Sequence, residues 1–304
     1  MLRRLLSPWV RMTKLRVVWI LLPLLAGPLA AAGLDTAPRA PRLVLTALLW
    51  AAWGIGLVSV LAPRPVGLTA LRIITPGLLI GAIISAAVAN SPALWIVVLG
   101  VGVCVGLQLL VTDTGLAVTA VNGLAYGDER RYPLRTPPGL YLAPLPLARA
   151  LVIAGVVTGP VAAAANEIAI AAIGFVVGIP LAVIAARSLH TLSRRWVVLV
   201  PAGVVIVDPL TIADPVLVVR QHIHNLRGPL GTDPVPSGAL DLRLGASWGT
   251  VVAELDGETD LVRTRRGHGE TLQPNSLVVA VVSRNNFLID ASQRRIPVVI
   301  TPTR

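Results

Sequence analysis

A serine in the last third of the chain matches a nucleophile pattern. Gly245-Ala246-Ser247-Trp248-Gly249 fits G-x-S-x-G, with Asp260 and His268 downstream as acid and base. The pattern activates serine only on a sharp turn between a strand and a helix. The residues after Ser247 are Thr-Val-Val-Ala, which indicate a strand. We therefore interpret this segment as a hairpin turn, and a hydrolase ranks third among the functions considered.

Two histidines have a spacing that suits metal chelation. His222 and His224 would share one face of a strand. A zinc site needs further ligands, and only Asp208, Asp214 or His190 could supply one by folding. The favoured interpretation is an exposed strand face without a metal or a cofactor, and metal binding shares the third place among the functions with the hydrolase.

Five arginines form a candidate anion-binding set. Three of them flank the glycines at 267 and 269, and two lie next to the last apolar stretch, where they could reach a lipid headgroup or a phosphate. Acidic residues at 254, 256, 258 and 260 could neutralise them across a hairpin, which is the favoured interpretation. The set is Arg194, Arg195, Arg263, Arg265 and Arg266.

Composition places these residues beside a membrane. The 304 residues are 55% hydrophobic and 13% charged, against about 25% charged in soluble proteins. The net charge of +11 comes mostly from residues 1–187, which hold 14 basic and 5 acidic residues. Because that excess flanks apolar segments, it sets orientation, and no nucleic-acid partner is predicted. The single cysteine, Cys104, excludes an intrachain disulfide, and the single lysine, Lys14, excludes a P-loop.

Six stretches are apolar enough to cross a bilayer, which takes about 20 residues in a helix. The polar pair Asn166 and Glu167 interrupts a double-length run, and we expect it at the tip of a helical hairpin, because a carboxylate at the bilayer centre is costly. Prolines inside the spans predict kinks. The predicted spans are residues 17–33, 43–62, 68–89, 93–111, 150–165 and 168–186.

The distribution of basic residues predicts the orientation. Arginine and lysine gather before the first span, after the second, after the fourth and after the sixth. The other gaps hold only Arg39 and Arg42. The positive-inside rule then places both termini in the cytoplasm, and the lipid bilayer is the surrounding medium.

The longest predicted cytoplasmic loop covers residues 112–149. Its first part, 115–125, could extend the fourth span or lie along the interface. Its second part is proline-rich, and we expect an extended linker on the membrane surface. Tyr126, Tyr132 and Tyr141 suit the headgroup level.

From residue 188 the pattern changes to short β-rich runs. Turn residues separate about seven expected strands, and a helix over 285–296 follows, capped by Asn285 or Asn286. The turn Pro201-Ala202-Gly203 joins the first two strands. The expected strands are 196–200, 204–207, 215–219, 239–244, 250–255, 261–264 and 277–283.

This layout resembles a known kind of protein. The runs SRRWVVLVPAGVVIVDPLTIADPVLVVRQHI (193–223) and NNFLIDASQRRIPV (285–298) are similar to an uncharacterised actinobacterial family of multi-pass membrane proteins with a C-terminal bacterial pleckstrin-homology-like (PH-like) domain. The resemblance implies a small β-barrel or sandwich used for binding. It does not carry over phosphoinositide binding, because the first hairpin turn lacks basic residues.

The sequence therefore predicts a six-helix transmembrane domain, residues 1–187, followed by a cytoplasmic PH-like domain, residues 188–304. The expected function is a non-enzymatic scaffold in the bacterial inner membrane, with protein or membrane-surface contacts through residues 188–304. The alternative function, which ranks second, is a small channel or transporter, in which Gln108 and Thr158 would line a polar cavity between the helices.

Overall fold

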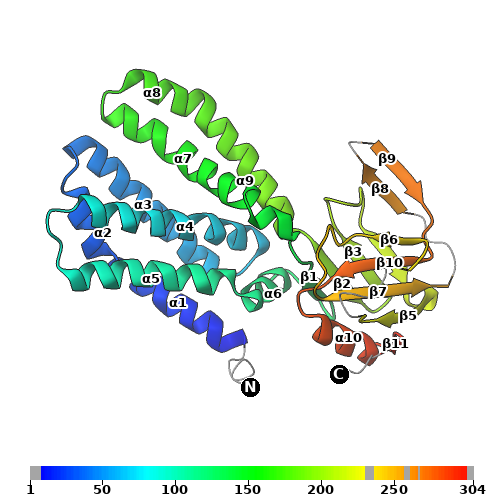
Figure 1. The fold of residues 1–304 in the computed structure, drawn as a ribbon. Helices are drawn as coiled ribbons and strands as arrows, with labels where there is room; N and C mark the ends of the chain where they lie inside the picture. The colour runs from blue at the N-terminus through cyan, green and yellow to red at the C-terminus, as the bar shows by residue number, and fades with distance from the viewer. Residues whose placement is uncertain (1–7, 230–235, 257–260, 266–267, 300–304) are drawn as a thin grey trace. The chain divides into compact units, whose positions relative to one another are not determined.

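The computed structural model describes residues 8–229, 236–256, 261–265 and 268–299 (Figure 1). The chain divides into a helical unit, Met1–Gly123 and Pro144–His190, and a β unit, Leu124–Ala143 and Thr191–Arg304. The chain therefore passes between the units three times, after Gly123, Ala143 and His190. The predicted boundary at 187/188 omits the segment Leu124–Ala143, which lies between two spans and belongs to the β unit.

Six helices among the described residues are long and apolar enough to cross a membrane, which confirms the predicted number and order of spans. Most of their surface is apolar and exposed, with Leu24, Leu94 and Ile168 more than 70% exposed. Such a surface requires hydrocarbon around it, so the chain is a multi-pass membrane protein. The helices are α1 (Pro8–Leu25) with α2 (Gly27–Leu34), α3 (Arg39–Leu61), α4 (Pro65–Val88), α5 (Leu94–Thr112), α7 (Pro144–Ala164), and α8 (Ile168–Ile173) continuing through η3 (Gly174–Gly178) into α9 (Ile179–Ser193).

Reciprocal bonds join the first two spans. The indole Nε1 of Trp19 on α1 donates to the carbonyl of Trp53 on α3 at 2.9 Å, and the indole of Trp53 donates to the carbonyl of Trp19 at 2.9 Å. Gly56 leaves room for the fully buried Trp19 ring, because a Cβ there would overlap it. Arg16 donates from Nε to the carbonyl of Val60 at 3.0 Å and so caps the end of α3.

The fifth and sixth spans form the predicted hairpin, and Figure 1 shows α7 and α8 side by side. Asn166 makes the turn at φ 61°, a left-handed conformation that asparagine tolerates. Gly155 lies against Gly178, and Gly159 lies against Gly174. This double G-x-x-x-G contact brings the two backbones close together. The π-helical turn η3 directly precedes Pro180, which has no N–H for an α-helical bond.

Residues 115–125 do not continue α5, which was one of the two predicted alternatives. Asp113 accepts a bond from the backbone N–H of Gly115 at 2.7 Å and caps a separate helix, α6 (Thr114–Asn122). The apolar face of α6 packs into the core of the helical unit through Leu116, Ala117 and Ala120.

The β unit has two main sheets and a two-stranded ribbon. The first sheet has the order β1-β2-β3-β4, and the second β11-β5-β7-β10-β6. Helix α10 (Arg284–Gln293) buries Phe287, Leu288 and Ala291 in the core that both sheets share. The strands are β1 (Arg130–Pro133), β2 (Trp196–Val200), β3 (Gly203–Val207), β4 (Val216–Val219), β5 (Ile223–Arg227), β6 (Ala239–Asp241), β7 (Thr250–Leu255), β8 (Leu261–Arg265), β9 (His268–Leu272), β10 (Ser276–Ala280) and β11 (Val298–Val299).

Each of the seven expected strands corresponds to a strand of the β unit, and β1, β5, β9 and β11 are additional. No sheet built from the described strands closes on itself, so the PH-like barrel stays a prediction. The predicted linker folds instead into β1, which pairs antiparallel with β2, and the 3₁₀ turn η2 (Pro138–Tyr141). The predicted asparagine cap is wrong, because α10 begins at Arg284 and its N-cap residue is Ser283.

Candidate functional site

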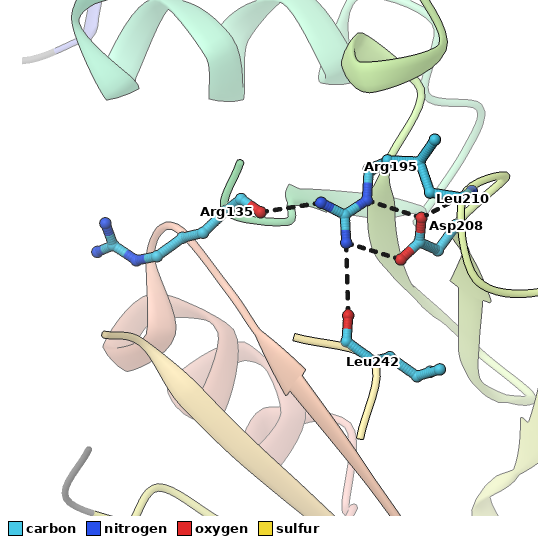
Figure 2. A network of polar contacts seen from close by, with 5 residues as sticks. All are labelled: Arg135, Arg195, Asp208, Leu210 and Leu242. Atoms are coloured by element: carbon cyan, nitrogen blue, oxygen red, sulfur yellow. Dashed lines mark hydrogen bonds and ion pairs between the residues drawn. The ribbon is translucent and has the colours of Figure 1, made fainter. Parts of the chain in front are cut away.

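A buried ion pair lies at the start of the β unit (Figure 2). Arg195 is 2% exposed and Asp208 is 1% exposed. The guanidinium donates from Nε to Oδ1 at 2.7 Å and from Nη2 to Oδ2 at 2.8 Å. This two-pronged geometry is the strongest form of an arginine–carboxylate contact.

The same guanidinium also contacts two other segments of the β unit. Arg195 donates from Nη1 to the carbonyl of Arg135, after β1, at 3.0 Å, and from Nη2 to the carbonyl of Leu242, after β6, at 3.4 Å (Figure 2). Asp208 also accepts from the backbone N–H of Leu210 at 3.2 Å. The hydrogen bonds of this buried pair are therefore made to other groups of the β unit.

Arg195 must consequently be removed from the predicted anion-binding set. Its neighbour Arg194 is exposed, in the turn that follows α9, where its N–H donates to the carbonyl of Thr191 at 3.1 Å. The backbones of Arg263 and Arg265 lie on β8, opposite Glu270 and His268 on β9. Arg266, Glu258 and Asp260 lie outside the described residues. The predicted neutralising acids on β7 are engaged elsewhere: Glu254 pairs with Arg227, and Asp256 pairs with His224.

The histidine pair does not share a strand face. His222 ends the short turn η4 (Arg220–His222), while His224 lies on β5 beside an irregularity in register. His224 Nδ1 contacts Asp256 Oδ1 at 3.0 Å, and both side chains are more than half exposed. Two of the suggested third ligands make other contacts: Asp208 binds Arg195, and His190 contacts Thr69 of α4. Among the described residues, no group of three His, Cys, Asp or Glu side chains could hold a metal.

Ser247 lies on the connection between β6 and β7, and the predicted hairpin is wrong, because β10 lies between these two strands and pairs with both of them. The chain passes through Gly245 at φ 86° and Gly249 at φ 77° and then enters β7. The carbonyl of Ser247 accepts from the hydroxyl of Thr250 at 2.7 Å. Because a strand follows this turn, it is not the strand-to-helix elbow that a nucleophilic serine requires. Asp260 lies outside the described residues.

The two polar positions proposed for a channel are separate. Gln108 on α5 accepts a bond from the Thr75 hydroxyl of α4 at 2.6 Å, and Thr75 is 1% exposed. Thr158 lies exposed on α7. The Gln108 side chain is therefore bound to α4, and the channel alternative stays a prediction.

One cluster escaped the sequence analysis. Four arginines from three segments gather around the β2–β3 turn; we name them the arginine surface. Arg130 on β1 lies opposite Leu199, and Arg294, after α10, donates to the carbonyl of Leu199 at 2.7 Å. The backbone N–H of Arg220 donates to the carbonyl of Ala202 in the turn. The arginine surface is Arg130, Arg220, Arg294 and Arg295.

The charge of this surface acts on its neighbours. Tyr132, predicted at the headgroup level, is instead 5% exposed and donates a hydrogen bond to Asp290 of α10. Burial raises the pKa of the Tyr132 hydroxyl, and its bond to Asp290 raises it further, while Arg130 and Arg294 oppose the shift. Arg130 and Arg294 therefore both lie close enough to the Tyr132 hydroxyl to influence its pKa. Arg220 adds to the group, because its guanidinium donates to the carbonyl of Arg294 at 3.4 Å.

The comparisons with known proteins leave the family open. Neither a family model, nor a curated protein, nor a solved structure matches this chain. The resemblance to PH-like membrane proteins therefore stays a prediction.

Proposed function

We propose that this protein is a non-enzymatic scaffold of the bacterial cytoplasmic membrane. Its β unit faces the cytoplasm and binds a protein partner. The arginine surface contacts an acidic segment of that partner. Arginine suits this role because its planar guanidinium pairs with carboxylates in two-pronged geometry and is enriched at interface hot spots.

The observation that carries the proposal is the convergence of the arginine surface. Its residues come from positions 130, 220, 294 and 295, yet Leu199, Ala202 and Arg294 link them through backbone contacts. Arg130, Arg220 and Arg295 are exposed. The surface lies at the far end of β2 from Arg195, about 16 Å along a five-residue strand. That distance from the last span favours a protein partner over lipid.

Contacts within the helical unit support the predicted orientation. Arg16 reaches Val60 at the end of α3, and the hydroxyl of Thr69, early in α4, contacts His190 near the end of α9. Arg16 and His190 therefore lie beside the connection between α3 and α4, the end of the bundle that also carries Arg64. The positive-inside rule assigns that end to the cytoplasm.

The test is chemical crosslinking and affinity purification of the full chain in mild detergent. Two double variants lower the charge of the β unit equally: Arg130→Gln with Arg220→Gln, and Asn285→Glu with Asn286→Glu at the other end of α10. We expect wild type and the asparagine variant to recover one stoichiometric partner, and the arginine variant to lose it. A wild-type protein that is consistently solitary would contradict scaffolding. A partner retained by both variants would exclude the arginine surface as its binding site.

A further inference from the structure

An exposed apolar pair lies on the segment between β6 and β7. Trp248 is 80% exposed and Leu244 is 43% exposed. Leu244 has φ 53°, a left-handed conformation that is unfavourable for leucine. The segment thus presents two apolar side chains outward at a cost in backbone strain. We name residues 243–249 the Trp248 turn.

The Trp248 turn is held firmly at both ends. Arg195 binds the carbonyl of Leu242 just before it, and the N–H of Val281 donates to the carbonyl of Gly249 at 2.8 Å. Ala246 is buried, and its N–H donates to the carbonyl of Arg243 at 3.1 Å. Because the backbone is already ordered, little conformational entropy is lost when the exposed tryptophan meets a partner.

The contact with Arg195 fixes the position of the turn along the chain. The last span ends at Ser193, two residues before Arg195, so their Cα atoms are at most about 7 Å apart. The carbonyl of Arg135, nine residues before the start of α7, binds the same guanidinium. The Trp248 turn therefore belongs to the end of the β unit where the chain enters and leaves the fifth and sixth spans.

We propose that the Trp248 turn inserts into the headgroup–acyl boundary of the bilayer that holds the helical unit. Tryptophan concentrates at this boundary because its ring is apolar and its N–H can remain hydrated. Leu244 adds apolar area beside it, and the exposed Arg194 supplies a positive charge for anionic headgroups. This binding is independent of the proposed protein partner, which would occupy the opposite end of β2.

Site-directed labelling of the full chain tests the insertion. Cys104 is the only cysteine, so a Cys104→Ala background allows single cysteines at Trp248 or Ser247 on the turn. Ile289→Cys, 48% exposed on α10, is the matched control. Each variant is labelled with an environment-sensitive fluorophore and reconstituted in vesicles of phosphatidylethanolamine and phosphatidylglycerol, with and without a nitroxide-labelled lipid.

We expect the lipid nitroxide to quench the labels at 247 and 248 several times more strongly than the label at 289. Aqueous iodide should quench in the reverse order. Labels at 247 and 248 that respond to both quenchers like the label at 289 would overturn the proposal. Since the three positions are exposed, folding of the β unit is checked by its resistance to protease in each variant.

Discussion

Arg195 and Asp208 are each tolerated in the core only because the other is present. Removing one partner of a buried pair costs about 3–5 kcal/mol, because the remaining charge stays buried and unpaired. We expect Arg195→Met and Asp208→Leu each to destabilise the β unit by this amount. The double variant should lose less than the two losses combined, since no charge is left behind. Protease resistance of the β unit in a urea series measures the free energy of unfolding.

Arg243 provides the control for this prediction. It pairs with Asp241 at 2.8 Å, and the two side chains are 14% and 39% exposed, against 2% and 0% for Arg195 and Asp208. Because water reaches this pair, Arg243→Met should cost less than Arg195→Met. Equal effects of Arg195→Met and Arg243→Met would show that the buried pair has no structural role.

The hairpin register contains the signal that identifies this pair. Trp196 pairs with Val207 and Val200 with Gly203 across the turn, so the next positions outward are Arg195 and Asp208. Once Pro201 and Ala202 are taken as a two-residue turn, the sequence alone places the two charges opposite each other. The arginine surface has no such signal, because residues 130, 220 and 294 meet only through long-range packing.

Tyr132 makes stability depend on alkaline pH. Burial raises the pKa of its hydroxyl, so the folded chain keeps a proton that the unfolded chain loses near pH 10. Stability is then fully present below about pH 10 and falls as the pH rises above that value. Tyr132→Phe keeps the ring packed edge-on against Phe287 and removes the titrating group.

We therefore expect Tyr132→Phe to cost about 1 kcal/mol at neutral pH and to flatten the alkaline loss. Urea midpoints from about pH 8 to about pH 11 measure the effect on both sides of the unperturbed value. Tyr126→Phe, at a residue that is 88% exposed, is the control and should keep the wild-type profile. An unchanged alkaline slope in Tyr132→Phe would assign the loss to other groups.

At the scale of elements, the contact between Gly159 on α7 and Gly174 on η3 sets the distance between these two helical segments. A Cβ at Gly174 would lie 2.5 Å from the backbone nitrogen of Gly159, so even alanine forces the helices apart. Overpacking of this kind costs about 1–3 kcal/mol. We expect Gly174→Ala to lower the melting temperature of the full chain in detergent.

Gly106 on α5 is the matched control, because a Cβ added there meets no described atom within 4 Å. Alanine at that position should be neutral or stabilising by up to about 1 kcal/mol, through its better helix propensity. If Gly174→Ala melts like Gly106→Ala, the hairpin has room to relax and the close contact is not required.

The sequence predicts a helix or strand well where a single local pattern, such as apolar length or a β-branched run, determines it. The spans follow from apolar length, and β2 and β7 from β-branched runs that the structure reproduces to the residue. β1 was missed because its sequence, RRYP, is charged and ends in proline. Its strand form depends on β2, which supplies the hydrogen-bonding edge, and on Leu134, which bridges to Val281. Such pairing is invisible in a local pattern.

At the scale of the whole molecule, β1 makes the segment Leu124–Ala143 part of the β unit. The chain therefore connects the β unit to the helical unit at three places. Because β1 precedes α7 and β2 follows α9, their pairing brings the two chain segments that flank the α7–α9 hairpin into one sheet.

The proposed topology gives the last prediction. Six spans put the segment before α1 and the β unit on the same side of the membrane, and the basic end of the bundle assigns that side to the cytoplasm. In a Cys104→Ala background, Asn90→Cys and Glu167→Cys lie in the gaps that have no basic residue. Both should react with an impermeant maleimide in intact spheroplasts. Tyr126→Cys and Gln293→Cys, exposed on the β unit, should react only after lysis. Labelling of Gln293→Cys in intact spheroplasts would reverse the orientation and remove the cytoplasmic scaffold proposal with it.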